Sequence, residues 1–270
     1  MSFLAPDFLL SAILLALVGC LAGVLSGLFG IGGGAVLVPI LVATFSLQGL
    51  LPDHIAHMAV GTSLAIIIPT AIRSYLSHRE HGAGNATLLR SWVFWVPFGV
   101  VAASSVVGFV PGIVLKYVFA AVASLIAFKM LFNQENWVIA QELPGPTANR
   151  SVGFGIGFLS TFMGIGGGNL NNLFMTLFGQ SMHQAVATSA GLGVLIAIPA
   201  ALGYIYAGWG SEGLPVWVFG YVNLLAVAMI APFSMLMAPF GAKLAHSLPA
   251  RKLEIGFGLF LVCVIISFVF

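Results

Sequence analysis

Two short stretches of the chain are identical and rich in glycine: residues 30–34 and residues 164–168 both read GIGGG. Each lies between apolar segments, where glycine lets the chain reverse direction and leaves the first N–H groups of the next helix uncovered. Such a helix N-terminus carries about half a positive elementary charge and binds anions. The two turns therefore predict an anion-binding site. Its predicted backbone contacts are Gly32, Gly33, Gly34, Gly166, Gly167 and Gly168.

Polar side chains lie beside both turns. The second turn is followed by Asn169, Asn171 and Asn172, where the first is followed by apolar residues. Three amides in an apolar segment are costly to bury unless they are paired. We favour a polar cavity wall over a structural network, and we assign Asn169 and Asn172 to the binding site. Ser26 and Ser160, each four residues before a turn, are further candidates to line it.

A second motif is also duplicated: HMAVGTS begins at residue 57 and HQAVATS at residue 183. Its hydroxyl residues complete the predicted substrate site: Thr62, Ser63, Thr188 and Ser189. The alternative is that these hydroxyls bond the backbone of their own helices, as Ser and Thr in membrane helices often do. For His57 and His183, which open the two motifs, an interfacial position is the simpler interpretation, and proton coupling is the alternative.

The elements that position these residues follow from composition. The chain is 60% hydrophobic and 6% charged, whereas a soluble domain has about 25% charged residues. Runs of about 20 apolar residues are long enough to span a bilayer as helices. These runs are apolar on every face, so they predict an all-α integral membrane protein rather than a β-barrel.

Several kinds of chemistry are disfavoured by what the sequence contains. Basic residues are spread thinly, so no nucleic-acid partner is predicted. Cys20 and Cys263 lie far from each other and from any histidine at ligand spacing, so neither a disulfide nor a metal is predicted. No cofactor is expected, and titratable residues gather only at predicted membrane interfaces, which argues against an enzyme.

The chain divides into two halves. A polar stretch, residues 132–150, is predicted to be a cytoplasmic linker between a first repeat, residues 1–131, and a second repeat, residues 151–270. The halves share the glycine turns, the hydroxyl motifs and, more weakly, Pro111 with Pro249, which indicates an internal duplication. The predicted apolar runs are residues 8–29, 35–47, 55–76, 90–109 and 114–131, then 151–163, 169–179, 184–207, 215–240 and 253–270.

The distribution of Lys and Arg predicts the topology, because basic loops face the cytoplasm. With the basic loops inside, the glycine turns join helix pairs that enter and leave on one side, from outside in the first half and from inside in the second. Only Lys116 departs from this pattern. Residues 35–47 and 169–179 are too short to span a bilayer. Each half is thus predicted to be a glycine-broken helix pair plus three transmembrane helices, and the two repeats have inverted topology, an architecture of secondary transporters.

The duplicated segments SGLFGIGGGAVLVPIL and GFLSTFMGIGGGNL, each followed by AVGTS or AVATS, resemble the sulfite exporter TauE/SafE family of bacterial membrane permeases. The resemblance covers nearly the whole chain. It implies transport of sulfur-containing anions, such as sulfite or organosulfonates, across the cytoplasmic membrane. It also implies that the glycine turns and the hydroxyl motifs form the substrate region. The asparagines after the second turn depart from the more usual pattern.

Together these observations predict a multi-pass secondary transporter of the cytoplasmic (inner) membrane that moves small sulfur-containing anions by alternating access. An anion channel that uses the same half-helices as its filter is the alternative. Nucleotide-driven transport is disfavoured because the chain has no phosphate-binding loop motif. The expected partners are the small anion and the lipid bilayer. The identity of the anion, the direction of transport, a coupling ion and the oligomeric state are left open.

Overall fold

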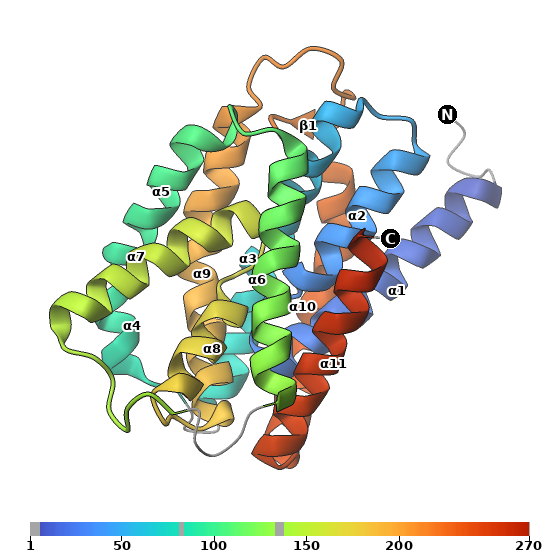
Figure 1. The fold of residues 1–270 in the computed structure, drawn as a ribbon. Helices are drawn as coiled ribbons and strands as arrows, with labels where there is room; N and C mark the ends of the chain where they lie inside the picture. Colours follow the sequence, from blue (N-terminus) through green and yellow to red (C-terminus); the bar gives the residue numbers. More distant parts are fainter. Residues whose placement is uncertain (1–5, 81–83, 133–137, 270) are drawn as a thin grey trace.

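The protein is a helical bundle, as the composition predicts (Figure 1). The computed structural model describes residues 6–80, 84–132 and 138–269. The helices are α1 (Pro6–Phe29), α2 (Gly34–Leu47), α3 (Pro52–Glu80), α4 (Ala86–Trp92), α5 (Trp95–Val107), α6 (Gly112–Phe132), α7 (Pro146–Met163), α8 (Gly168–Leu177), α9 (Met182–Ala207), α10 (Leu224–Ser247) and α11 (Ala250–Val269). One antiparallel hairpin joins β1 (Val218–Phe219) to β2 (Val222–Asn223).

Several helices have the length that a bilayer requires. Within the described residues, α3, α6, α9 and α10 are each long and apolar enough to cross a membrane, and the bent pair of α4 and α5 would make one more span. The 14-residue α2 is a shorter apolar helix. The expectation of a short helix after the first glycine turn is therefore confirmed, and the 10-residue α8 after the second turn is shorter still.

Two predicted runs differ from the structure. Residues 90–109 form no single helix, because α4 and α5 meet at an angle of 45°. Pro97 explains the bend, since it lacks the N–H that would bond the carbonyl of Val93 and its ring crowds that carbonyl. Residues 215–240 do not begin as helix either, because the β1–β2 hairpin occupies their start. Gly220 turns that hairpin at φ +57°, and α10 begins only at Leu224.

The predicted linker, residues 132–150, is partly helical. Its last residues form the first turn of α7, where Pro146 occupies the favoured N-terminal position. Residues 133–137 of the linker and residues 1–5 of the predicted first repeat lie outside the described part of the chain. The division into repeats at these boundaries stays a prediction.

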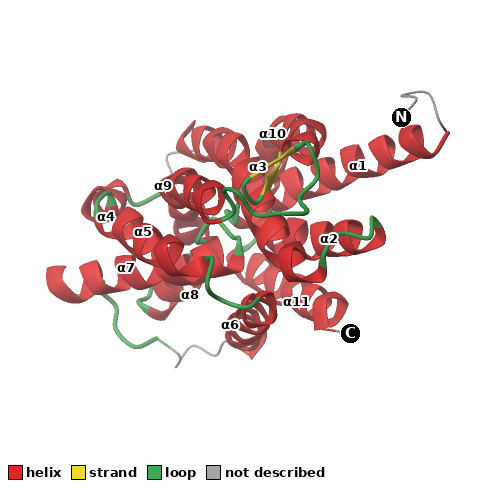
Figure 2. Ribbon diagram, turned by 90° about the horizontal axis from the view of Figure 1, so that it is seen from above, coloured by secondary structure: helices red, strands yellow, loops and turns green. Residues whose placement is uncertain are grey.

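Glycines at helical spacing bring pairs of helices into contact. A side chain at Gly19, Gly23 or Gly27 of α1 would collide with the backbone of α10. Gly99 of α5 and Gly157 of α7 face each other's helices in the same way. The spaced glycines therefore allow these helices to pack closely. Figure 2 shows the result from above, with α1 and α10 on one side of α3 and the group of α5, α7 and α9 on the other.

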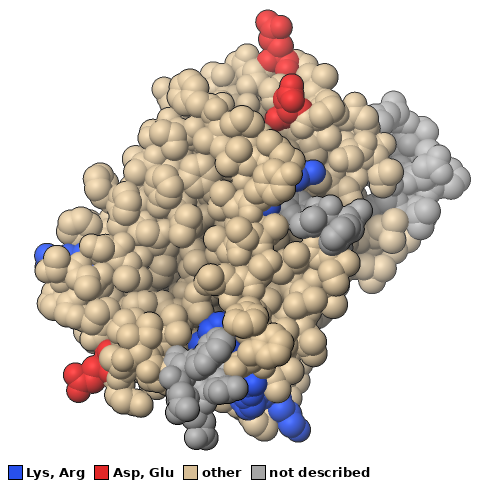
Figure 3. Space-filling model, viewed as in Figure 1, with Lys and Arg blue, Asp and Glu red and all other residues tan. Residues whose placement is uncertain are grey.

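The two ends of the bundle differ in charge. Helices α3, α6 and α10 have basic residues in their last turns, and these helices end at the lower side of Figure 1. In Figure 3 blue atoms gather mainly toward that lower end, whereas red atoms of acidic side chains appear at both the upper end and the lower left. By the rule that basic ends face the cytoplasm, the lower end is the predicted cytoplasmic side.

Candidate functional site

Both glycine turns have a backbone that favours glycine. The first turn has positive φ angles at Gly30 (+68°), Gly32 (+69°) and Gly33 (+83°), and the second at Gly164 (+68°) and Gly167 (+77°). Residues with a Cβ rarely adopt this left-handed region. The angles reverse the chain within a few residues, so that α2 and α8 each start directly after their turn.

The two turns lie against each other. A Cβ added at Gly34, the first residue of α2, would collide with the carbonyl oxygen of Gly164, and one added at Gly168, the first residue of α8, would lie 2.5 Å from the carbonyl oxygen of Gly30. Each half-helix therefore starts on the backbone of the opposite turn. From there α2 leads toward the upper end of Figure 1 and α8 toward the lower end. This close approach by itself requires glycine at both positions, whether or not a ligand binds.

The start of each half-helix has backbone donors without an acceptor in the described structure. The N–H groups of Gly34 and Ala35 make no backbone or side-chain hydrogen bond there, and neither do those of Gly168, Asn169 and Leu170. Backbone bonding begins in α2 with the N–H groups of Val36 and Leu37, which both donate to the carbonyl oxygen of Gly33, and in α8 with the N–H of Asn171. Because buried N–H groups are costly to leave unpaired, these donors are suited to an anionic ligand.

Three side chains beside the turns are buried and unpaired. Ser26 and Ser160 are 0% and 1% exposed, and neither hydroxyl has a hydrogen-bond partner in the structure. Asn169 is 1% exposed, and both its amide nitrogen and its amide oxygen lack a partner. The three residues lie on α1, α7 and α8, at the ends that adjoin the turns. The protein itself supplies no partner for their buried polar atoms, as is also the case for Ser74, Ser104 and the amide oxygens of Asn149 and Asn171.

The other two asparagines belong to a network. Asn172 donates to the carbonyl oxygen of Phe29 over 2.9 Å and accepts from Ser189 Oγ over 2.8 Å. Asn171 donates to Ser189 Oγ over 2.8 Å, whereas its own amide oxygen has no partner. The network ties α8 to α9 and to the end of α1. Of the three amides that the sequence offered as a cavity wall, Asn169 is the one without any bond of this kind.

The hydroxyl motifs contact the opposite half of the chain. Ser63 Oγ donates to the carbonyl oxygen of Gly164 over 2.9 Å, so α3 holds the second glycine turn. Thr62 Oγ1 accepts from the backbone N–H of Asn223 over 2.9 Å, and Thr188 Oγ1 accepts from that of Asn85, also over 2.9 Å. Both threonines thus anchor the start of another helix. Their place in the substrate site stays a prediction.

The sequence did not single out Asn85 and Asn223, but it carried a signal for them. Each precedes its repeat's proline, Pro111 or Pro249, by the same interval. Each also caps a helix with its side chain, which accepts from the N–H three residues later. An asparagine before an apolar run is a helix-start signal.

His57 and His183 contact the ends of helices. The Nε2 atom of His57 lies 3.2 Å from the carbonyl oxygen of Val107, the last residue of α5. The Nε2 atom of His183 lies 3.1 Å and 2.9 Å from the carbonyl oxygens of Ala245 and Leu248, at the end of α10. Each contact satisfies carbonyl groups that a helix end leaves open. Proton coupling through either histidine stays a prediction.

A buried lysine lies at the far end of α8. Lys129 is 5% exposed, and its Nζ donates to Thr176 Oγ1 over 2.8 Å. Thr176 in turn bonds the carbonyl oxygen of Asn172, which connects the lysine to the amide network. In the sequence Lys129 looks like an ordinary basic residue at a helix end, so no local signal indicates this contact.

No metal site emerges in the part of the chain that the structure describes, where no group of three His, Cys, Asp or Glu side chains is arranged to hold an ion. The donors gathered at the turns are backbone amides, hydroxyls and one free amide, which suit a small anion rather than a cation.

A family model described as "Sulfite exporter TauE/SafE" matches residues 15–268 of the chain. The protein belongs to this family. A probable membrane transporter protein of Haemophilus influenzae is 34% identical over 257 residues, which cover 94% of this chain and 97% of the relative. A probable membrane transporter protein of Methanocaldococcus jannaschii is 30% identical over 251 residues, or 92% of each chain. No solved structure gives a significant match. The TauE/SafE assignment and the apolar helices make this chain a multi-pass membrane transporter.

Proposed function

We propose that the protein is a secondary transporter of small sulfur-containing anions, such as sulfite or organosulfonates, in the cytoplasmic membrane. The observation that carries this proposal is the meeting of two half-helix starts at Gly34 and Gly168, with unbonded N–H groups and the unpaired side chain of Asn169 beside them. The family description supplies the sulfur anion as the substrate class.

The charge of the site fits a monoanion. Each helix N-terminus contributes about half a positive elementary charge, so two together offset about one negative charge. Their N–H groups would bind the anion without a basic side chain in the middle of the membrane. A membrane potential that is negative inside favours exit of a monoanion by about 2.3 kcal/mol per 100 mV, so export needs no coupling ion.

The reciprocal contacts support two inverted repeats and alternating access. Gly34 lies on the second turn and Gly168 on the first, while Thr62 and Thr188 each hold a helix start in the other half. Equivalent residues exchange contacts in this way when two halves are related by a two-fold axis. A site on that axis can be exposed to either side by rocking one half against the other.

The test measures uptake of radiolabelled sulfite, sulfoacetate and sulfate into proteoliposomes. Wild-type uptake of a sulfur anion should saturate and show counterflow. Asn169→Asp places a like charge in the site at nearly constant volume, and should lower uptake at least about tenfold. Asn169→Leu should also lower uptake without lowering stability, because neither amide atom has a partner to lose.

The matched control is Ser151→Ala, which removes an exposed hydroxyl that bonds only its own helix, at the carbonyl oxygen of Thr147. Its uptake should equal that of the wild type. Flux without saturation or counterflow would indicate a channel instead of a carrier. Absence of flux for every sulfur anion would contradict the substrate class, and full activity of Asn169→Asp would contradict the site.

A further inference from the structure

A large cavity opens at the upper end of Figure 1, which has few basic residues and is the predicted outer side. Its volume is about 740 Å³, and it lies between the start of α3, the end of α5 and the start of α6. We call it the outer vestibule. The titratable side chains in its lining are those of Asp53, His54, His57, Lys116 and Tyr221.

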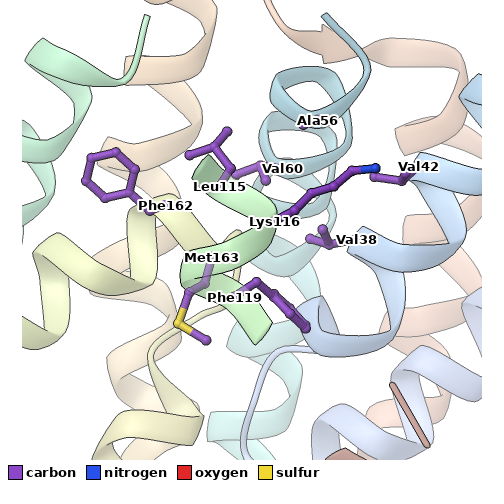
Figure 4. A pocket seen from close by; sticks show the side chains of 9 residues that line it. All are labelled: Val38, Val42, Ala56, Val60, Leu115, Lys116, Phe119, Phe162 and Met163. Atoms are coloured by element: carbon purple, nitrogen blue, oxygen red, sulfur yellow. The ribbon is translucent and has the colours of Figure 1, made fainter. Parts of the chain in front are cut away.

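A narrow apolar space continues inward from the outer vestibule. Its volume is about 10 Å³, roughly the space that one water molecule requires. We call this space the neck, and its main side chains are Val38, Val60, Phe119, Phe162 and Met163. Lys116 and Ala56 line both spaces, so the neck begins where the outer vestibule ends. Figure 4 shows Lys116 reaching from α6 toward α2, close to Val38 and Val42.

The inner end of the neck is the second glycine turn. Phe162 and Met163 directly precede Gly164 in the chain. A Cβ built on Gly164 would lie 2.8 Å from Cγ2 of Val38 and 3.0 Å from Cγ1 of Val60. The neck side chains are therefore the layer that separates the outer vestibule from the turn. At this size the layer excludes any anion with several heavy atoms.

We propose that the outer vestibule is the entry or exit site for the anion on the outer face, that Lys116 attracts the anion there, and that the neck is the closed outer gate. This inference rests on the proposed function and adds to it a second anion site and the position of a gate. Lys116 is the basic residue that departs from the cytoplasmic bias of the sequence, and an outer anion site accounts for its position on the outer side.

The outer vestibule contains side chains of both charges, and their removal should change the KM for the anion in opposite directions. Lys116 and Asp53 line the same cavity, and His54, His57 and Tyr221 are the other titratable side chains in its lining. Lys116→Met should raise the KM for the anion supplied on the outer face by about tenfold, because a cation in a cleft concentrates anions there. Asp53→Asn should lower that KM, and Lys116→Arg should keep it close to the wild-type value. KM on the cytoplasmic face should stay unchanged in all three variants.

These constants are measured in right-side-out and inside-out membrane vesicles, so that each face is tested separately. An unchanged outer KM in Lys116→Met, with normal wild-type transport, would overturn the role of Lys116. Equal changes on both faces would overturn it as well, because they indicate a general effect on the protein.

The gate is tested by thiol accessibility, which requires no transported substrate. In a background with Cys20→Ala and Cys263→Ala, a membrane-impermeant thiol reagent is applied from the outer face. Ile113→Cys, which lines the outer vestibule and is 53% exposed, should react quickly. Val60→Cys, which lies in the neck and is 2% exposed, should react at least about tenfold more slowly, because it waits for an opening event.

Truncation of the neck by Met163→Ala, or by Val38→Ala if the first variant folds poorly, should speed the reaction of Val60→Cys and leave that of Ile113→Cys unchanged. Equal reaction rates at the two cysteines in the untruncated protein would overturn the gate. If the wild type moves no sulfur anion, the proposed function fails, and the accessibility assay still decides whether the neck closes.

Discussion

The backbone N–H of Asn223 donates a 2.9 Å hydrogen bond to Thr62 Oγ1, and Asn223 in turn caps α10. The same arrangement joins Asn85, which caps α4, to Thr188. Each threonine therefore fixes the start of a helix in the opposite half of the chain. The duplicated motif thus has one structural task that is performed twice.

Replacement of either threonine by valine tests this task. Thr62→Val and Thr188→Val keep the shape of the side chain but leave a backbone N–H without its acceptor, at a cost of about 1–3 kcal/mol. The measurement is the free energy of unfolding in detergent. Thr44→Val is the control, because Thr44 Oγ1 bonds only the carbonyl oxygen of Ile40 in its own helix. If Thr44→Val lowers the free energy of unfolding as much as the other two variants do, the proposed anchoring of helix starts by Thr62 and Thr188 is contradicted.

Because the glycine turns touch, Gly→Ala substitutions should change stability very differently at different positions. Gly34→Ala and Gly168→Ala place a methyl group against the backbone of the opposite turn, and overpacking of this kind costs about 1–3 kcal/mol. Gly155→Ala enters open space within α7 and should stabilise the protein by about 0.5–1 kcal/mol. Thermal unfolding of the three variants checks this order. Equal stability of all three would show that the turns do not touch.

Substitution of the unpaired serines should weaken anion binding without lowering the stability of the protein. Ser26→Ala and Ser160→Ala remove hydroxyls that have no partner within the protein, so the free energy of unfolding should stay constant or rise. The KM for the transported anion should rise by about tenfold, the value of one hydrogen bond to a charged group. Transport kinetics and unfolding are measured on the same preparations. A loss of stability at unchanged KM would return these serines to a structural role.

The two histidines offer a test of proton coupling. In His57→Gln and His183→Gln an amide N–H replaces the ring N–H near the helix-end carbonyls, so much of the contact is retained. If the histidines act only as caps, transport in these variants should depend on an imposed pH gradient as it does in the wild type. Loss of that dependence, with the protein still folded, would instead support proton coupling.

The helices and the turns were predictable because their signals are local. Consecutive glycines in an apolar segment indicate a break, and the short runs that follow them match α2 and α8. The bend before Pro97 and the hairpin at Gly220 were missed, since both interrupt apolar sequence that resembles a continuous helix. Hydropathy depends on side chains, whereas these breaks depend on backbone geometry.

The contacts within the candidate site were harder to predict from the sequence. The sequence predicts Thr62 in the substrate site, but it does not reveal the bond between Thr62 and Asn223. It grouped three asparagines together, of which Asn169 is left without a bond and Asn172 is fully engaged. Partner choice between residues more than a hundred positions apart depends on tertiary packing, which periodicity does not report.

The crossed contacts also bear on the biosynthesis of the protein. While the first half is being inserted, the acceptor for Ser63 and the donor for Thr62 have not been synthesised, because Gly164 and Asn223 come later in the chain. The glycine turn at residues 30–34 likewise lacks the surface on which it packs. These polar groups of the first half therefore lack their partners until translation has passed Asn223. Final assembly of this transporter is a late event, closed by the second half.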